Sequence, residues 1–206
     1  MFSVFLRGLL IGFSIAAPVG PIGLLCIRRT LADGRTVGFV SGLGAATADA
    51  FYGAVAGFGL TAVSGALVQG QTPLRLVGGA FLCYLGVRTF LARPGQAAAL
   101  GGRRGLLGAY ASTLGLTLTN PSTILSFVAI FAGLGLGSGG SSYTSAGLLV
   151  AGVFIGSALW WLILSATAGA VRGRLTPAGL RWVNRLSAVI LAGFGVAALV
   201  SVWSGG

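Results

Sequence analysis

The stretch Ala16-Ala17-Pro18-Val19-Gly20-Pro21 interrupts an apolar run that extends from about residue 4 to residue 27. Each proline removes a backbone hydrogen-bond donor and obstructs the carbonyl one turn before it, and the glycine between them permits unusual backbone conformations. We therefore predict that a helix breaks or unwinds here. Backbone groups freed at membrane depth persist only where protein or a water-filled cavity satisfies them. The stretch thus indicates a binding site, with a structural kink as the alternative.

The composition is that of a membrane protein. Of the 206 residues, 55% are hydrophobic and 7% are charged, and the mean hydropathy is +0.97. The charged residues are thirteen arginines and two acids, which are too few to cover the surface of a soluble domain. Because the arginines lie at the ends of apolar runs, we attribute the net charge of +11 to membrane orientation and not to nucleic-acid binding.

Six apolar runs, separated by short polar breaks, predict six transmembrane helices. Each run offers the roughly 20 residues that a hydrocarbon core demands. The runs lie at about 4–27, 37–60, 73–91, 106–133, 145–170 and 182–203. The first, third and fifth breaks carry nearly all the arginines, and Arg75 is the exception in the second. Since cytoplasmic loops keep the positive charge, we predict that both termini face the non-cytoplasmic side.

The two halves of the chain resemble each other at an offset of about half its length. The matches are Arg7-Gly8-Leu9-Leu10 with Arg104-Gly105-Leu106-Leu107, and Gly44, Ala48, Asp49 and Tyr52 with Gly152, Gly156, Ser157 and Trp160. Three spans per copy is an odd number, so the second copy must be inverted, as in many transporters. We predict an all-α membrane protein with one transporter domain over 1–206. It comprises a first repeat (1–92), a cytoplasmic linker (93–103) and a second repeat (104–206).

The fourth run has an interruption of its own, at the position equivalent to the first break. It consists of Thr117, Thr119, Asn120 and Pro121. Asn120 is an amide with both donors and acceptors, and the threonines can cap a broken turn or face a polar substrate. Interrupted segments in corresponding places of two halves point to a transporter's binding site. We therefore predict broken first and fourth helices that face one substrate.

Asp49 lies near the middle of the second apolar run. A carboxylate at that depth is costly unless it is paired, protonated or exposed to water, so it is a candidate for function. It would act as a proton carrier, as the counter-charge to a substrate ammonium group, or as a cation ligand. The structural alternative is a hydrogen bond to a neighbouring helix. The second acid, Asp33, is interpreted as part of a cytoplasmic turn.

Enzymatic function is not expected, because the chain has no histidine, no metal-ligand cluster and no phosphate loop with its lysine. We predict no bound cofactor and a proton or other ion gradient as the driving force. Cys26 and Cys83 have no Cys-x-x-Cys spacing and are interpreted as packing residues. The alternatives left open are a metal-ion or other small-solute exporter of similar architecture, a thiol–disulfide conduit and a non-transporting scaffold.

The segments Ala16–Leu25, Arg28–Leu31 and Gly34–Gly38 together resemble the signature of the lysine exporter (LysE/RhtB) family. Gly42-Leu43-Gly44 with Asp49, and Asn120–Leu125, fit the same pattern. The resemblance covers essentially the whole chain. It implies a bacterial inner-membrane exporter of amino acids or related small metabolites, driven by the electrochemical gradient, and a homodimer.

The residues suggest the same mechanism on physical grounds. The N-termini of half-helices suit a carboxylate, and Asp49 with unwound carbonyls suits an ammonium group. We predict that a zwitterionic amino acid binds between the two broken helices and that the two repeats rock to expose it on alternate sides. Besides this substrate, the lipid bilayer is the predicted partner. The predicted transport-site residues are Pro18, Gly20, Pro21, Asp49, Tyr52, Thr119, Asn120, Pro121, Ser157 and Trp160.

Overall fold

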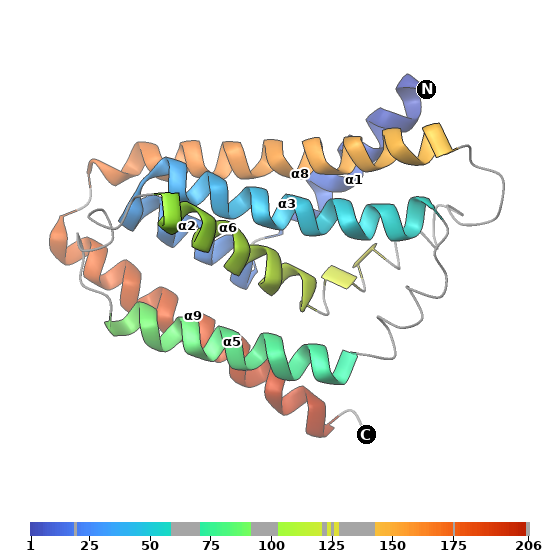
Figure 1. Cartoon of the computed structure of the whole chain (residues 1–206). Coiled ribbons are helices and arrows are strands. Elements are labelled where there is room, and N and C mark those ends of the chain that lie inside the picture. Colours follow the sequence, from blue (N-terminus) through green and yellow to red (C-terminus); the bar gives the residue numbers. More distant parts are fainter. Residues whose placement is uncertain are drawn as a thin grey trace.

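The computed structural model describes residues 1–18, 20–58, 71–91, 103–120, 123–124, 126–127, 143–174 and 176–204. The secondary-structure elements in these ranges are α-helices (Figure 1), which confirms the predicted all-α fold for the described part of the chain. In chain order the helices are α1 (Phe2–Ala16), α2 (Pro21–Asp33), α3 (Arg35–Gly57), α5 (Gln71–Leu91), α6 (Arg103–Leu118), α8 (Tyr143–Arg172) and α9 (Pro177–Ser204).

The first apolar run forms two helices instead of one, as predicted from its prolines. α1 ends at Ala16, α2 begins at Pro21, and the two axes differ in direction by 80°. Proline suits the first position of a helix, because its missing N–H would have no intrahelical partner there. α2 ends where Gly34 takes a φ of +108°, a conformation that glycine adopts without strain.

Up to four segments among the described residues have the length and hydropathy of a membrane span. Three are the main parts of α5, α8 and α9, and the fourth is the bent pair of α1 and α2 taken together. α3 corresponds to the predicted run 37–60, and α6 is apolar but shorter. The run 106–133 continues beyond α6 into residues that are described only in part. The chain is thus a helical membrane protein, and the count of six crossings stays a prediction.

Two groups of helices pack around α2. In the larger group, α3 contacts both α6 and α8, and α1 packs along α8. The smaller group consists of α5 and α9, which pack chiefly against each other (Figure 1). Because α2 contacts α3, α8 and α9, it joins the two groups.

Close approach of backbones fixes α1 against α8. A Cβ atom at Gly12 would overlap the backbone of Val153, and one at Gly156 would overlap the backbone of Leu9. Small residues allow such contacts in lipid, where no hydrophobic force drives one helix against another. At the C-terminal end of α1, just before the break, Ala16 is buried in one apolar cluster with Ile22 of α2 and Ala45 of α3.

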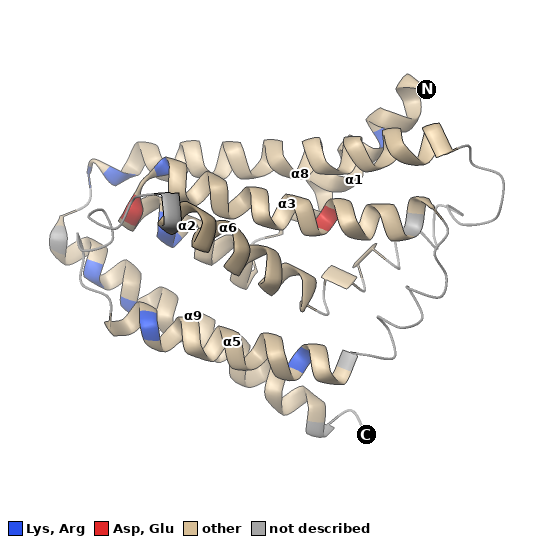
Figure 2. Cartoon of the chain, in the orientation of Figure 1, with Lys and Arg blue, Asp and Glu red and all other residues tan. Residues whose placement is uncertain are grey.

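The positive charges are concentrated at one end of the bundle. Figure 2 shows most of the arginines at the end where α2 meets α3 and where α8 turns toward α9. The chain termini lie at the opposite end (Figure 1). Arg75, near the start of α5, contacts Ser201 close to the C-terminal end of α9 and thus lies away from the arginine-rich end.

Candidate functional site

The backbone makes a tight turn at the first break. The Gly20 amide donates to the Pro18 carbonyl at 3.0 Å, and the Leu24 amide donates to the Gly20 carbonyl at 3.0 Å as α2 begins. The amides of Ile22 and Gly23, in the first turn, have no carbonyl of their own helix to bond. Since the N-terminal end of a helix carries partial positive charge, this turn presents donors that suit an anion.

The second break follows the end of α6 at Leu118. The Asn120 amide donates to the Thr117 carbonyl at 3.2 Å, and the Asn120 carbonyl accepts the Thr123 amide at 3.1 Å. The Asn120 backbone thus bonds residues on both sides of the interruption that the sequence predicts. Pro121, which the sequence pattern also assigns to this break, lies outside the described residues.

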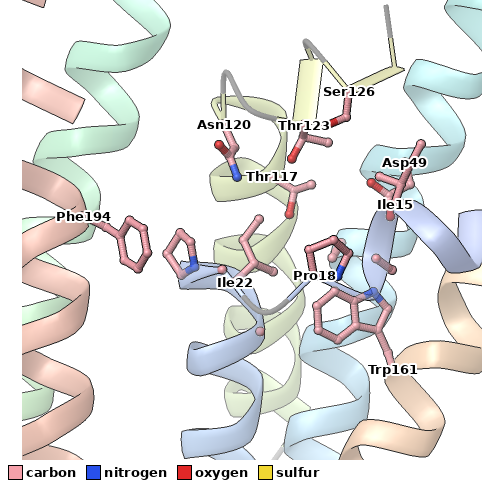
Figure 3. Close-up of a pocket in the computed structure, with 15 residues that line it drawn as sticks. Ile15, Pro18, Ile22, Asp49, Thr117, Asn120, Thr123, Ser126, Trp161 and Phe194 are labelled. Atoms are coloured by element: carbon pink, nitrogen blue, oxygen red, sulfur yellow. The ribbon is translucent and has the colours of Figure 1, made fainter. Parts of the chain in front are cut away.

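Both breaks line one cavity of about 400 Å³. Figure 3 shows Thr117 and Asn120 from the α6 side and Asp49 from α3 arranged around the break at Pro18. The volume is in the range of small-molecule sites. The described wall residues are Ile15, Ala16, Pro18, Gly20, Pro21, Ile22, Gly23, Ala45, Asp49, Thr117, Asn120, Thr123, Ser126, Trp161 and Phe194.

Asp49 is the one charged residue among these described walls. It is 3% exposed, and its Oδ2 accepts a 2.7 Å hydrogen bond from the Ser157 hydroxyl. The Trp161 indole N–H donates to the same hydroxyl at 3.1 Å, so a chain of hydrogen bonds ends on the carboxylate. Within the described part of the chain, no arginine pairs with Asp49. A carboxylate in this setting suits a cationic group brought by a ligand.

Most of the predicted transport-site residues are brought together. The cavity walls include Pro18, Gly20, Pro21, Asp49 and Asn120. Ser157 contacts the site through its hydrogen bond to Asp49. The predicted repeat would give Asp49 and Ser157 matching positions, and the structure places these two residues in direct contact.

Three predicted residues lie away from this cavity. Tyr52 is buried, and its hydroxyl donates to the Leu118 carbonyl at 2.6 Å, which satisfies a backbone acceptor at the end of α6. Thr119 donates to a carbonyl of its own helix at 2.9 Å and lines a second, smaller cavity. Trp160 packs edge-on against Phe13, with the ring centroids 5.4 Å apart.

Sequence reasoning missed Trp161 and Phe194. Trp161 lies one turn after Ser157, so helical spacing could have indicated it. Trp160 fits nearly the same spacing, however, and the packing of α8 decides which ring reaches the cavity. Phe194 has no local signal, because it joins the site only through the contact of α9 with α2.

Arg29 anchors the far half of α2 to two neighbouring helices. Its Nη1 donates to the Ser41 hydroxyl on α3, and to the Ala109 carbonyl and the Thr113 hydroxyl on α6, each at 2.9 Å. Its Nη2 donates to Ser112 at 2.8 Å. A guanidinium group can hold several acceptors at once because its donors form a rigid fork.

Two further arginines tie α2 to the remaining neighbours. The Arg28 Nε donates to Asn184 on α9 at 3.3 Å. The Arg172 Nε, at the end of α8, donates to the Leu31 carbonyl at 3.0 Å. α2 is therefore bound to α3, α6, α8 and α9 near its C-terminal end. This leaves its N-terminal end directed at the cavity.

The chain is similar to known proteins over nearly its whole length. The family model described as LysE type translocator matches residues 13–202. A protein of Bacillus subtilis (strain 168), named "Putative amino acid efflux protein YcgF", is 30% identical over 197 residues, which cover 94% of this chain and 93% of that protein. The "Uncharacterized membrane protein YahN" of Escherichia coli (strain K12) is 30% identical over 195 residues, covering 87% of this chain and 80% of that protein. No solved structure matches the chain.

Proposed function

The chain belongs to the LysE type translocator family, whose members are transporters and not enzymes, and on this premise we propose that it exports amino acids or related small zwitterionic metabolites. The transport is secondary active and crosses the bacterial inner membrane. The observation that carries the proposal is the cavity that joins Asp49 to the N-terminal end of α2. The name of the Bacillus subtilis relative, an amino acid efflux protein, supports this substrate class.

The cavity offers one pole for each charge of a zwitterion. The substrate ammonium group binds the Asp49 carboxylate, which Ser157 holds in place. The substrate carboxylate binds the first turn of α2, where amide donors and the helix dipole favour an anion. The Asn120 side chain lies in the same wall and supplies a polar group beside it. Around these poles, Ile22 and Phe194 form an apolar surface for the rest of the molecule.

We further propose that the chain crosses the membrane six times in two inverted repeats, 1–92 and 104–206, joined by a cytoplasmic linker. The contact between Asp49 and Ser157 supports this arrangement. Two residues related by a pseudo-two-fold axis can touch only near that axis, where inverted-repeat transporters bind substrate. The position of both termini opposite the arginine-rich end (Figures 1 and 2) supports termini on the non-cytoplasmic side.

Alternating access follows from movement between two groups of helices. Helices pack across the proposed repeats, α1 on α8 and α5 on α9, so neither repeat forms a separate body that rocks alone. The moving unit is instead the pair of α5 and α9, relative to the group around α3. The cavity has walls from both groups, since Phe194 comes from α9 and Asp49 from α3. Movement of the pair would therefore change access to it.

Efflux from proteoliposomes tests the proposal. Vesicles holding the purified protein are loaded with the standard amino acids, a pH gradient or membrane potential is imposed, and the released amino acids are quantified by mass spectrometry. Wild-type protein should release one or a few amino acids in a gradient-dependent manner. Asp49→Asn should lower that release about tenfold or more, because it removes the charge that binds the ammonium group.

The matched control is Asp33→Asn, which neutralises the other acid of the chain. Asp33 is the last residue of α2 and is not among the described walls of the cavity. This variant should export at the wild-type rate. Full export by Asp49→Asn would exclude Asp49 from the mechanism, and release of no amino acid by the wild type would contradict the proposed substrate class.

A further inference from the structure

A second cavity, of about 230 Å³, adjoins the first. It lies between the pair of α5 and α9 on one side and α2 with α6 on the other. Its described walls are mostly small or apolar, with Gly78 and Gly79 from α5 and Ala197 and Ala198 from α9. Arg75 is the one charged residue among them.

Arg75 gives this cavity a charge opposite to that of the first. An arginine in an apolar helix of a membrane protein is costly, and such residues commonly serve substrate or ion pathways. Its Nη1 donates to the carbonyl and the hydroxyl of Ser201 on α9 at 3.4 and 3.5 Å. These bonds to α9 position the guanidinium at the cavity wall.

The two cavities share a partition made of Pro21, Asn120 and Phe194, which line both. Figure 3 shows Phe194 reaching from α9 toward Ile22 beside the first cavity. Phe194 is 44% exposed, and it comes from the pair of helices to which we assign the movement. A shift of α9 would therefore open or close the partition.

We propose that the Arg75 cavity is a second substrate site, which binds the carboxylate of the transported molecule after it has passed Phe194. The proposal rests on the proposed export function. Guanidinium groups bind carboxylates through two parallel hydrogen bonds, which selects the carboxylate over a neutral group of the same shape. Arg75 contacts Ser201 near the C-terminal end of α9, and both chain termini lie opposite the arginine-rich end (Figure 1), so the site stands on the proposed export side of the first cavity. When the substrate leaves Asp49, the carboxylate of the substrate moves first toward Arg75.

Ligand-dependent thermal unfolding of the purified protein tests this site without requiring transport. The probes are isovalerate and isovaleramide, which share one shape and differ in charge. A ligand that binds only the folded state raises its stability. We expect isovalerate near saturation to raise Tm by about 2–4 °C, a shift typical of a modest gain in stability in a chain of this length, and isovaleramide to leave Tm unchanged.

Isovalerate lacks the ammonium group that would offset the Asp49 carboxylate, so we expect it not to bind in the first cavity. Arg75→Gln should therefore abolish the isovalerate shift, whereas Arg75→Lys should keep part of it because a lysine still carries the charge. Ala197→Leu, which fills the cavity and leaves the arginine in place, should abolish the shift as well, so the test does not depend on one variant. The matched control is Arg88→Gln, which removes an arginine of the same helix that contacts Tyr84 and lies outside both cavities.

In the efflux assay, Arg75→Gln should slow export of the identified amino acid at least about fivefold, a loss of about 1 kcal/mol, while Arg88→Gln should not. An isovalerate shift that persists in both Arg75→Gln and Ala197→Leu would overturn the proposal even if the wild type exports amino acids. A shift that depends on Arg75, in a protein that exports no amino acid, would instead support the carboxylate site and contradict the proposed function.

Discussion

Ser157 on α8 donates a 2.7 Å hydrogen bond to the buried carboxylate of Asp49 on α3, although 108 residues separate them in the chain. Trp161 in turn donates to Ser157. The acid that lines the cavity is therefore held by a helix from the other half of the molecule. This contact links substrate binding to the packing of α3 on α8.

Removal of the Ser157 hydroxyl should weaken both stability and transport. Ser157→Ala leaves a buried carboxylate oxygen without its donor, so we expect the free energy of unfolding to fall by about 1–3 kcal/mol. Denaturant unfolding in detergent and the efflux assay measure the two effects. The control is Ser165→Ala on the same helix, because that hydroxyl donates only to carbonyls of its own helix. Equal losses in the two variants would show that Ser157 has no special role at Asp49.

Restoration of a helix-forming residue at the first break should impair transport without impairing stability. Pro18→Ala returns a backbone donor and removes the clash with the preceding turn, so α1 can extend toward Pro21. We expect Tm to stay the same or rise and efflux to fall several-fold, because the amides at the start of α2 lose their position. Pro73→Ala, in the first turn of α5, is the control, since a proline there displaces no helical hydrogen bond. Undiminished efflux by Pro18→Ala would show that the break is a structural kink.

Replacement of Arg29 by lysine should clearly lower the stability of the folded protein. Lysine keeps the charge but lacks the rigid fork that reaches acceptors on both α3 and α6. We expect Arg29→Lys to lower the free energy of unfolding by about 1.5–3 kcal/mol, the value of a charged hydrogen bond. Arg174→Lys is the control, because Arg174 is exposed at the same end of the bundle. A stability of Arg29→Lys equal to that of the control would mean that the hydrogen bonds around Arg29 do not hold α2.

Local features of the fold were predictable from the sequence because their causes are local. Proline lacks a backbone donor wherever it occurs, so the break at Pro18 and the start of α2 at Pro21 follow from the residues themselves. The apolar runs near 73–91 and 145–170 match α5 and α8 to within a few residues for the same reason. The depth of Asp49 in an apolar run likewise indicated a buried acid, and it is 3% exposed.

The partners of these residues were decided only by the tertiary structure. A helix in a membrane is apolar on nearly all its faces, so its sequence does not reveal which face meets protein and which meets lipid. Three features depend on how helices that are distant in the chain pack together. They are the presence of Trp161 instead of Trp160 in the cavity wall, the presence of Phe194 in the same wall, and the four hydrogen-bond acceptors around Arg29. The position of the break in the first helix follows from the residues alone, because it depends on the covalent structure of proline. Packing determined what the break faces, because its neighbours Asp49, Asn120 and Trp161 come from three other segments of the chain.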